Sequence, residues 1–239
     1  MDAIDAFFNA TLTIGDQHMS WREIVGNLFG LASALGGMRR KVWAWPVGIV
    51  GNLVLFTVFM GSWFGDSSRA DMLGQAGRQV MFLIVSIYGW VQWRRTERAA
   101  LEVRADGRIP ADGGAAVHPH WATWRERVGI VVVMVGGTLL LTPLFRALGS
   151  YEPVWSDAWI FMGSLVATYG MAKGWVEFWL VWVAVDVVGV PLLWSAGYYA
   201  TALMYVFYGV FTLTGFFVWW RVHRREQAQA GATTPAVAP

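Results

Sequence analysis

The 239-residue sequence has no cysteine and few charged residues. The absence of cysteine excludes disulfides, thiolate metal sites and cysteine nucleophiles. Charged residues make up 14% of the chain, whereas a soluble domain usually carries about 25%. The formal net charge of +2 is too small to indicate nucleic acid as a partner. The composition therefore argues against a nucleic-acid-binding protein and against a single soluble core.

Motifs of catalysis are missing as well. The chain has no glycine-rich phosphate-binding loop, no Gly-x-Ser-x-Gly motif and no soluble domain to hydrolyse ATP. The first 20 residues contain no Lys or Arg, so no signal peptide is predicted. All four histidines lie outside the apolar segments, which excludes a membrane zinc site and a histidine proton relay: His18, His118, His120 and His223. We therefore predict a protein that is not an enzyme and that has no cofactor and no metal site.

Apolar residues are abundant, at 56% of the chain, and they include 16 Trp; the chain also has 27 Gly. Gly is frequent in membrane helices, and Trp gathers at the membrane interfaces. A helix that crosses a bilayer needs about 20 mostly apolar residues. Seven segments are of this kind: 22–38, 42–64, 72–93, 128–148, 155–172, 175–195 and 198–220. We predict an all-α integral membrane protein with seven transmembrane helices in the lipid bilayer.

The polar residues divide this chain into parts. The only long polar stretch contains the helix breakers Pro110 and Gly113 and is predicted to be a loop, and the tail from Gln227 is predicted to be disordered. The expected parts are an extracytoplasmic N-terminal segment (1–20), a first three-helix unit (21–93), a cytoplasmic loop (94–127), a linker transmembrane helix (128–148), a second three-helix unit (149–222) and a cytoplasmic tail (223–239).

The placement of positive charge predicts the orientation. With the N-terminus outside, the inner side receives three basic residues at 39–41, seven in 94–127, one at 173 and three at 221–225, which is 14 of the 18 Lys and Arg. The outer side keeps Arg22, Arg69, Arg78 and Arg146. Because loops on the cytoplasmic side carry the excess of Lys and Arg, we expect a multi-pass protein of the cytoplasmic (inner) membrane, with its N-terminus out and its C-terminus in.

The two three-helix units resemble each other in sequence. An offset of 134 residues aligns their first two helices, and an offset of 126 aligns their third helices. The polar and aromatic matches are Glu23 with Asp157, Gly36 with Gly170, Arg39 with Lys173, Trp45 with Trp179, Asn52 with Asp186, Gly89 with Gly215, Trp93 with Trp219 and Arg95 with Arg221. The fourth segment has no counterpart. This pattern predicts a 3+1+3 parallel repeat, with a substrate bound between the units near the membrane midplane.

The most informative candidate site is the motif formed by Trp179, Trp182 and Asp186. Positions i, i+3 and i+7 share one face of a helix, and a carboxylate in mid-membrane normally faces a partner or a wet cavity. We interpret the three as an aromatic slot with a polar grip, suited to a flat ring that bears a polar or cationic group. The alternative is that the tryptophans are interface anchors and that Asp186 accepts a structural hydrogen bond.

Further candidates for substrate binding come from the repeat. Trp45 and Asn52 have the same i, i+7 spacing as Trp179 and Asp186. Gln79 and its counterpart Tyr205 lie in the third helices, and Tyr88 lies toward the inner end. Each has a second interpretation, since Asn52 and Gln79 suit helix packing and an aromatic belt explains Tyr88 well.

Taken together, these residues resemble the PnuC family of nicotinamide riboside transporters over about 22–222. The resemblance rests first on the Trp-x-x-Trp-x-x-x-Asp motif that ends at Asp186. Two runs support it: Trp43-Ala-Trp45-Pro46-Val-Gly48 and Ser86-Ile-Tyr88-Gly89-Trp90-Val-Gln-Trp93. The polar loop 94–127 departs from the family pattern.

The resemblance implies a SWEET-like fold, facilitated diffusion, trapping of the vitamin by a cytoplasmic kinase, and a homotrimer. It implies nicotinamide riboside as the main substrate, with riboflavin or thiamine as alternatives within the family. Transport would be passive, or coupled through Asp186 or Glu177. A membrane scaffold with no transport role is the alternative of a different class, and it predicts no stabilisation by any of the three vitamins.

Overall fold

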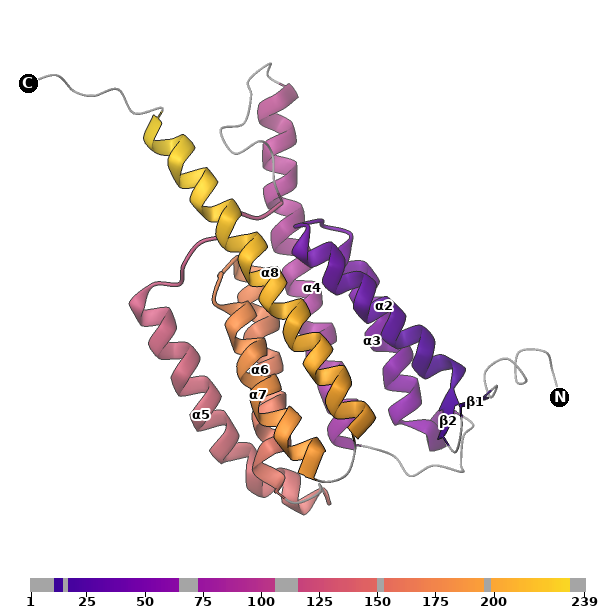
Figure 1. The fold of residues 1–239 in the computed structure, drawn as a ribbon. Coiled ribbons are helices and arrows are strands. Elements are labelled where there is room, and N and C mark those ends of the chain that lie inside the picture. The colour runs from indigo at the N-terminus through magenta and orange to yellow at the C-terminus, as the bar shows by residue number, and fades with distance from the viewer. Residues whose placement is uncertain are drawn as a thin grey trace, which may run out of the picture.

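In the computed structural model, the described residues are 11–14, 17–64, 73–105, 116–149, 153–195 and 199–232. They form seven α-helices, matching the seven predicted segments in number and order (Figure 1). The helices are α2 (Trp21–Met38), α3 (Ala44–Phe59), α4 (Leu73–Ala105), α5 (Trp124–Ala147), α6 (Val154–Lys173), α7 (Phe178–Ser195) and α8 (Tyr199–Ala232). A short 3-10 helix, η1 (Gly61–Phe64), follows α3.

The N-terminal segment contains a small hairpin that the sequence analysis did not predict. Strands β1 (Thr11–Ile14) and β2 (Gln17–Ser20) pair antiparallel, with Thr11 opposite Ser20. Residue Ser20 is also the N-cap of α2, so the hairpin leads directly into the first helix.

Helix α4 continues twelve residues beyond the predicted end of its segment at residue 93. The prediction of a loop is therefore wrong for residues 94–105. These residues are mostly Arg, Glu, Ala and Leu, which are good helix formers, and the first glycine and proline come later, at Gly107 and Pro110. At 33 residues, α4 is about 50 Å long and extends past a hydrocarbon core of about 30 Å.

Helix α8 behaves in the same way at the C-terminus. It extends to Ala232, so the prediction of disorder from Gln227 is wrong for residues 227–232, while 233–239 lie outside the described residues. Both long helices project beyond the other helices on the same side of the bundle (Figure 1). We call this side, where α2 and α6 end and α3, α5 and α7 begin, the inner end.

The helices pack as two groups of three with α5 at one edge. In the N-terminal triplet, α2 packs on α3 and α3 on α4; in the C-terminal triplet, α6 packs on α7 and α7 on α8. Helix α4 packs on α6 and so joins the triplets, and α5 packs on α6 alone among its major neighbours. Figure 1 shows α5 on the outer side of the C-terminal triplet.

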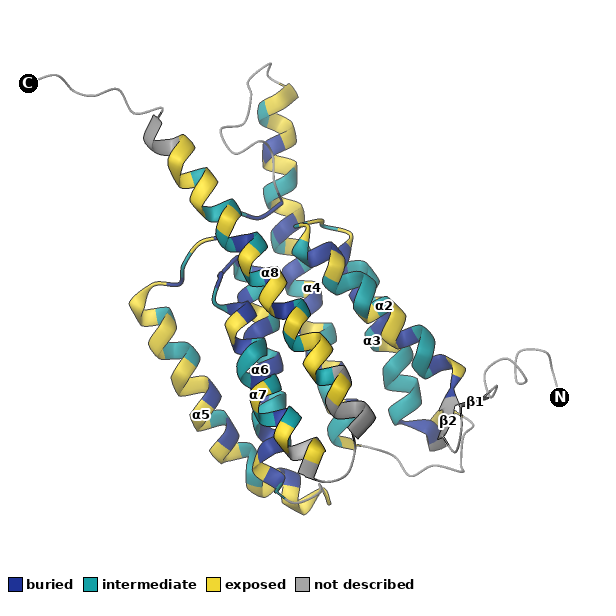
Figure 2. Cartoon of the chain, in the orientation of Figure 1, coloured by how far each residue is buried: buried dark blue, intermediate teal, exposed yellow. Residues whose placement is uncertain are grey.

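The outward face of α5 is apolar. Val132, Leu139 and Leu140 expose 61%, 72% and 74% of their surface, and most of α5 is coloured as exposed in Figure 2. Among the described helices, α5 alone is both long and apolar enough to cross a membrane by those two criteria. Only 17% of its most apolar window is buried, which is unlike the core helix of a soluble protein. Such a surface is costly in water and suits a lipid environment.

Candidate functional site

Four tryptophans form a row across the inner half of the bundle. The row runs from Trp45 on α3 through Trp93 on α4 and Trp219 on α8 to Trp179 on α7. Successive ring centroids lie 5.3 Å, 6.3 Å and 6.1 Å apart, and the first and last pairs meet edge to face, at 88° and 79°. All four indoles are buried. Trp45 and Trp179, predicted as substrate-binding residues, are therefore packed core residues at the two ends of this indole row.

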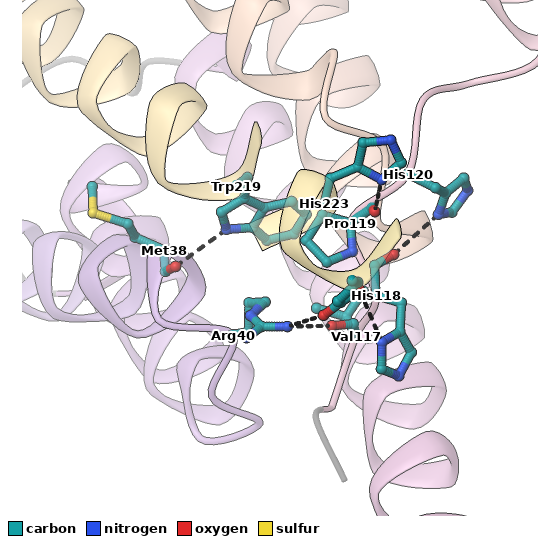
Figure 3. Close-up of polar contacts among 9 residues, drawn as sticks. Met38, Arg40, Val117, His118, Pro119, His120, Trp219 and His223 are labelled. Atoms are coloured by element: carbon teal, nitrogen blue, oxygen red, sulfur yellow. Dashed lines mark hydrogen bonds and ion pairs between the residues drawn. The ribbon is translucent and has the colours of Figure 1, made fainter. Parts of the chain in front are cut away.

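Two reciprocal hydrogen bonds tie the triplets together at the centre of the row. The Trp93 indole N–H donates to the carbonyl of Ala172 at 3.2 Å, and the Trp219 indole N–H donates to the carbonyl of Met38 at 3.2 Å. Figure 3 shows the second of these bonds. Residues 93 and 219 are 126 positions apart and residues 38 and 172 are 134 apart, which are the two offsets that align the halves of the sequence.

Glycine makes room for the outer indoles of the row. A Cβ atom on Gly89 would lie 2.4 Å from the Trp45 ring, and a Cβ atom on Gly215 would lie 2.4 Å from the Trp179 ring. No side chain fits at either position without moving an indole. These two glycines are also a matched pair in the sequence repeat, so each triplet seats its tryptophan in the same manner.

The indole N–H groups of Trp45 and Trp179 are buried and have no hydrogen-bond partner among the described residues. Trp93 and Trp219 differ, because theirs are satisfied by backbone carbonyls. Leaving a buried donor unpaired costs about 1–3 kcal/mol, so such groups usually meet a ligand or an ordered water molecule. The two ends of the row therefore present matched donors that call for a polar acceptor.

The rest of the Trp179 motif faces the interface between the triplets. Trp182 on α7 stacks on Phe82 of α4, with ring centroids 6.5 Å apart and planes inclined by 27°. One turn further along α7, Asp186 is half-buried and its Oδ2 atom has no hydrogen-bond partner within the described part of the chain. A Cβ atom on Gly209 of α8 would lie 3.6 Å from this oxygen. The sequence analysis did not identify Phe82.

Helices α4 and α8 add two polar residues beside Asp186. Tyr205 on α8 interacts electrostatically with Asp186 and with Arg78 of α4. The Arg78 guanidinium donates a hydrogen bond to Gln75, and its Nε atom is buried without a partner in the described residues. The sequence analysis counted Arg78 only as an outer positive charge. An arginine inside the apolar segment 72–93 was the signal that it had a second role.

The remaining three candidates lie elsewhere. Gln79 is buried on α4, one residue from Arg78. Tyr88 stacks on Tyr169 of α6 at 5.7 Å and accepts a hydrogen bond from Gln92 at 3.2 Å. Asn52 is half-buried on α3. The structure thus brings Trp182, Asp186 and Tyr205 to the interface of the triplets and places Trp45 and Trp179 in the indole row.

Residues 116–123, which precede α5, form a strap across the inner end. His120 bridges to the α6–α7 turn: its N–H donates to Gly174 O at 2.9 Å, and its carbonyl accepts from Val176 N–H at 2.9 Å. Gly174 has a φ of 85°, and a Cβ atom there would lie 2.8 Å from Val117. The Glu177 carboxylate accepts from Ala122 N–H at 3.0 and 3.1 Å.

Glu177 also accepts from Arg127 Nε at 2.8 Å. Its carboxylate is therefore committed to holding the strap, and the structure does not favour it as a coupling site for transport.

The other side of the strap is held by the α2–α3 turn and by α8 (Figure 3). Arg40 donates to Val117 O at 3.3 Å and forms an ion pair of 3.0 Å with Glu226. His223 contacts the carbonyl of Pro119 at 2.7 Å through Nδ1. The strap therefore contacts the α2–α3 turn, α8 and the α6–α7 turn, and so fixes the inner ends of both triplets. Nothing in the spacing of these residues predicted it.

Comparison with known proteins identifies the family to which this chain belongs. The sequence matches the nicotinamide mononucleotide transporter family over residues 20–221. The chain belongs to this family. Its similar proteins include the riboflavin/roseoflavin transporter RibM of Streptomyces davaonensis, which is 39% identical over 224 residues covering 92% of this chain and 94% of that protein. The nicotinamide riboside transporter PnuC of Escherichia coli is 27% identical, covering 90% and 92% of the two chains.

The fold agrees with this assignment. The crystal structure of the vitamin B3 transporter PnuC superimposes with a TM-score of 0.61 over 86% of this chain and 83% of that chain, at 21% identity. The expected resemblance to the PnuC family is therefore confirmed, and so is the expectation of a transporter rather than an enzyme. The expectation of nicotinamide riboside as the main substrate is less well supported than the riboflavin alternative, because the riboflavin transporter is the more similar of the two relatives.

Proposed function

We propose that this protein takes up riboflavin, or a closely related flavin, across the cytoplasmic membrane. The described residues include seven buried side-chain polar atoms without a hydrogen-bond partner, and three of these carry the proposal: the indole N–H groups of Trp45 and Trp179 and the Oδ2 atom of Asp186. All three belong to residues that the sequence had independently indicated as substrate-binding. Similarity to a riboflavin transporter supports the same substrate class.

The chemistry of a flavin suits these groups. Its ring carbonyls accept hydrogen bonds from indole N–H groups, and its imide N–H and side-chain hydroxyls can donate to the Asp186 carboxylate. Trp179 and Asp186 are seven residues apart, which is a rise of about 10 Å along α7. The three fused rings of a flavin cover this distance as one rigid plane, which neither the single ring of nicotinamide nor the separate pyrimidine and thiazolium rings of thiamine do. Trp182 and Phe82 offer aromatic faces for stacking between the two ends.

The proposed architecture is a 3+1+3 parallel repeat of SWEET-like type, in which α5 links the two triplets. The support is that equivalent contacts occur in the two triplets. Trp45 packs on Gly89 in one triplet as Trp179 packs on Gly215 in the other, and each triplet donates one indole hydrogen bond to the other. A pseudo-twofold axis along the membrane normal would pass between Trp93 and Trp219, which meet at the centre of the row. The substrate would bind near this axis, between α4 of one triplet and α7 and α8 of the other.

The proposed mode of transport is facilitated diffusion, with trapping by a cytoplasmic kinase. The long ends of α4 and α8 carry seven of the 18 Lys and Arg, and six more lie beside them at 39–41, 125, 127 and 173, which supports an N-out, C-in orientation with the inner end in the cytoplasm. The family resemblance further suggests a homotrimer, and the exposed apolar face of α5 is available for contacts with lipid or with another copy.

Ligand-dependent stability tests the proposal directly. Purified protein should show a saturable rise in its unfolding temperature with riboflavin and a much smaller rise with nicotinamide riboside or thiamine. Proteoliposomes should then fill with riboflavin only to the external concentration. A larger rise in unfolding temperature with nicotinamide riboside than with riboflavin would support the nicotinamide riboside substrate that the sequence resemblance implied. No rise with any of the three vitamins would favour the scaffold alternative.

A further inference from the structure

A cavity lies at the inner end, away from the interface where we place the vitamin. It has a volume of about 310 Å³ and opens between the end of α4, the strap and the end of α6. The side chains that give it its chemistry are Gln92, Arg95, Thr96, His118, His120 and Lys173. They come from the N-terminal triplet, the strap and the C-terminal triplet. The volume is at the lower end of the range for small-molecule pockets, about 300–1,000 Å³.

The charge of this cavity is of one sign. Among the described residues, its lining contains Arg95, Lys173 and two histidines and no Asp or Glu, and one of the histidines, His118, lies 3.3 Å from the Glu226 carboxylate outside the lining. Neither Arg95 nor Lys173 forms an ion pair with any residue in the described ranges, whereas the nearby Arg40 and Arg127 are paired with glutamates. The strap that carries the histidines is fixed on both sides by its backbone hydrogen bonds. The basic groups are therefore held around one space.

Basic residues also gather on the cytoplasmic side of membrane proteins for reasons of topology alone. Residues placed for that purpose need only be near the membrane and do not have to converge. Here Arg95 from one triplet and Lys173 from the other line the same cavity. Two histidines, the Thr96 hydroxyl and the Gln92 amide line it with them. The Thr96 hydroxyl donates to the Gln92 carbonyl at 3.3 Å, and the Gln92 amide donates one of its two hydrogens to Tyr88. A guanidinium, an ammonium and an amide donor in one pocket are groups that proteins use to bind phosphate.

We propose that this cavity binds a phosphate monoester. The ester would come from the cytoplasm, and the phosphorylated vitamin that the kinase produces belongs to this chemical class. In this respect the inference rests on the proposed function and on the N-out, C-in orientation.

A bound phosphate would bridge Arg95 of α4, Lys173 at the end of α6 and the strap, and would hold the inner ends of the triplets together. Product made in the cytoplasm would thereby slow further uptake.

Binding is tested on the purified full-length protein in a neutral detergent, with riboflavin 5′-phosphate and inorganic phosphate as probes. The variant is Arg95→Gln with Lys173→Gln, and the control is Arg98→Gln, an exposed arginine of α4 that does not line the cavity. Riboflavin 5′-phosphate should raise the unfolding temperature saturably in the wild type and the control, and the double variant should bind it at least tenfold more weakly. The response to riboflavin itself should be the same in all three proteins.

Each outcome separates the two proposals. Equal stabilisation of the wild type and the double variant by the phosphate ester would overturn the cavity proposal, as would no stabilisation by either phosphate probe. A normal phosphate response without any response to riboflavin would instead refute the proposed function and leave the cavity site standing.

Nanodiscs with and without phosphatidylglycerol distinguish a lipid headgroup from a free ester. If the anionic lipid stabilises the wild type but not the double variant, and soluble phosphate esters have no effect, the site binds a lipid headgroup and the proposed feedback by the phosphorylated product is refuted. In proteoliposomes, riboflavin 5′-phosphate enclosed at the inner side should slow riboflavin entry severalfold in the wild type and not in the double variant.

Discussion

Replacing Trp182 with alanine gives the sharpest test of where the vitamin binds. Trp182 is half-buried on α7 and stacks on Phe82 across the interface of the triplets. Stacking of a base on an aromatic side chain is worth about 1–3 kcal/mol by alanine substitution, which corresponds to roughly a 5- to 150-fold loss of affinity. Trp182→Ala should therefore weaken riboflavin binding by about tenfold or more, as measured by fluorescence quenching or calorimetry on the purified protein.

The substitution also removes a contact within the protein, so stability must be followed separately. An aromatic pair contributes about 0.5–1.5 kcal/mol beyond its buried area, and the unfolding temperature without ligand should fall by a corresponding few degrees. Trp155→Ala is the matched control, because Trp155 is an exposed tryptophan on α6, and its affinity for riboflavin should not change. An affinity that is unchanged in folded Trp182→Ala protein would refute the reasoning and would make Trp182 a packing residue only.

Three further predictions follow from the same structure. Gly215→Ala should lower the free energy of unfolding by about 1–3 kcal/mol, because its Cβ atom would collide with the Trp179 ring. The control is Gly77→Ala, where an added Cβ atom meets no neighbour within 4 Å and the protein should not be destabilised; equal effects of the two substitutions would mean that the Trp179 indole moves aside freely. Asp186→Asn should leave the endpoint of riboflavin uptake in proteoliposomes unchanged under an imposed pH gradient, and accumulation above equilibrium that the variant loses would establish proton coupling instead. Single cysteines introduced into this cysteine-free chain at the exposed residues Trp63 and Ala228 should react with an impermeant reagent from opposite sides of the membrane, and labelling from one side would disprove the N-out, C-in topology.

The extended ends of α4 and α8 show where local sequence reasoning stops. The sequence prediction ended each helix at the last residue of its apolar segment. A helix continues into water wherever the next residues are good helix formers, as in 94–105 and 227–232. Polarity therefore marked the end of each apolar segment and said nothing about the backbone beyond it.

The sequence by itself determined the number and order of the helices, because each bilayer-length run of apolar residues is a local signal. It also determined the two offsets that relate the triplets, since the paired Trp and Gly residues are readable without coordinates. Only the tertiary structure decided that Trp45 and Trp179 are packed ends of an indole row while Trp182 and Asp186 face the interface. Residues on one helix face share a direction, but the neighbours that meet that face come from distant segments.

The strap and the role of Glu177 depended even more on tertiary contacts. Glu177 and Ala122 are 55 residues apart, and Arg40 and Glu226 are 186 apart. No periodicity connects such positions, because their contact arises only when both triplets have packed and their inner ends lie side by side. The sequence thus supplied the helices, the repeat and the candidate residues, and the packing of the two triplets decided which of these residues meet.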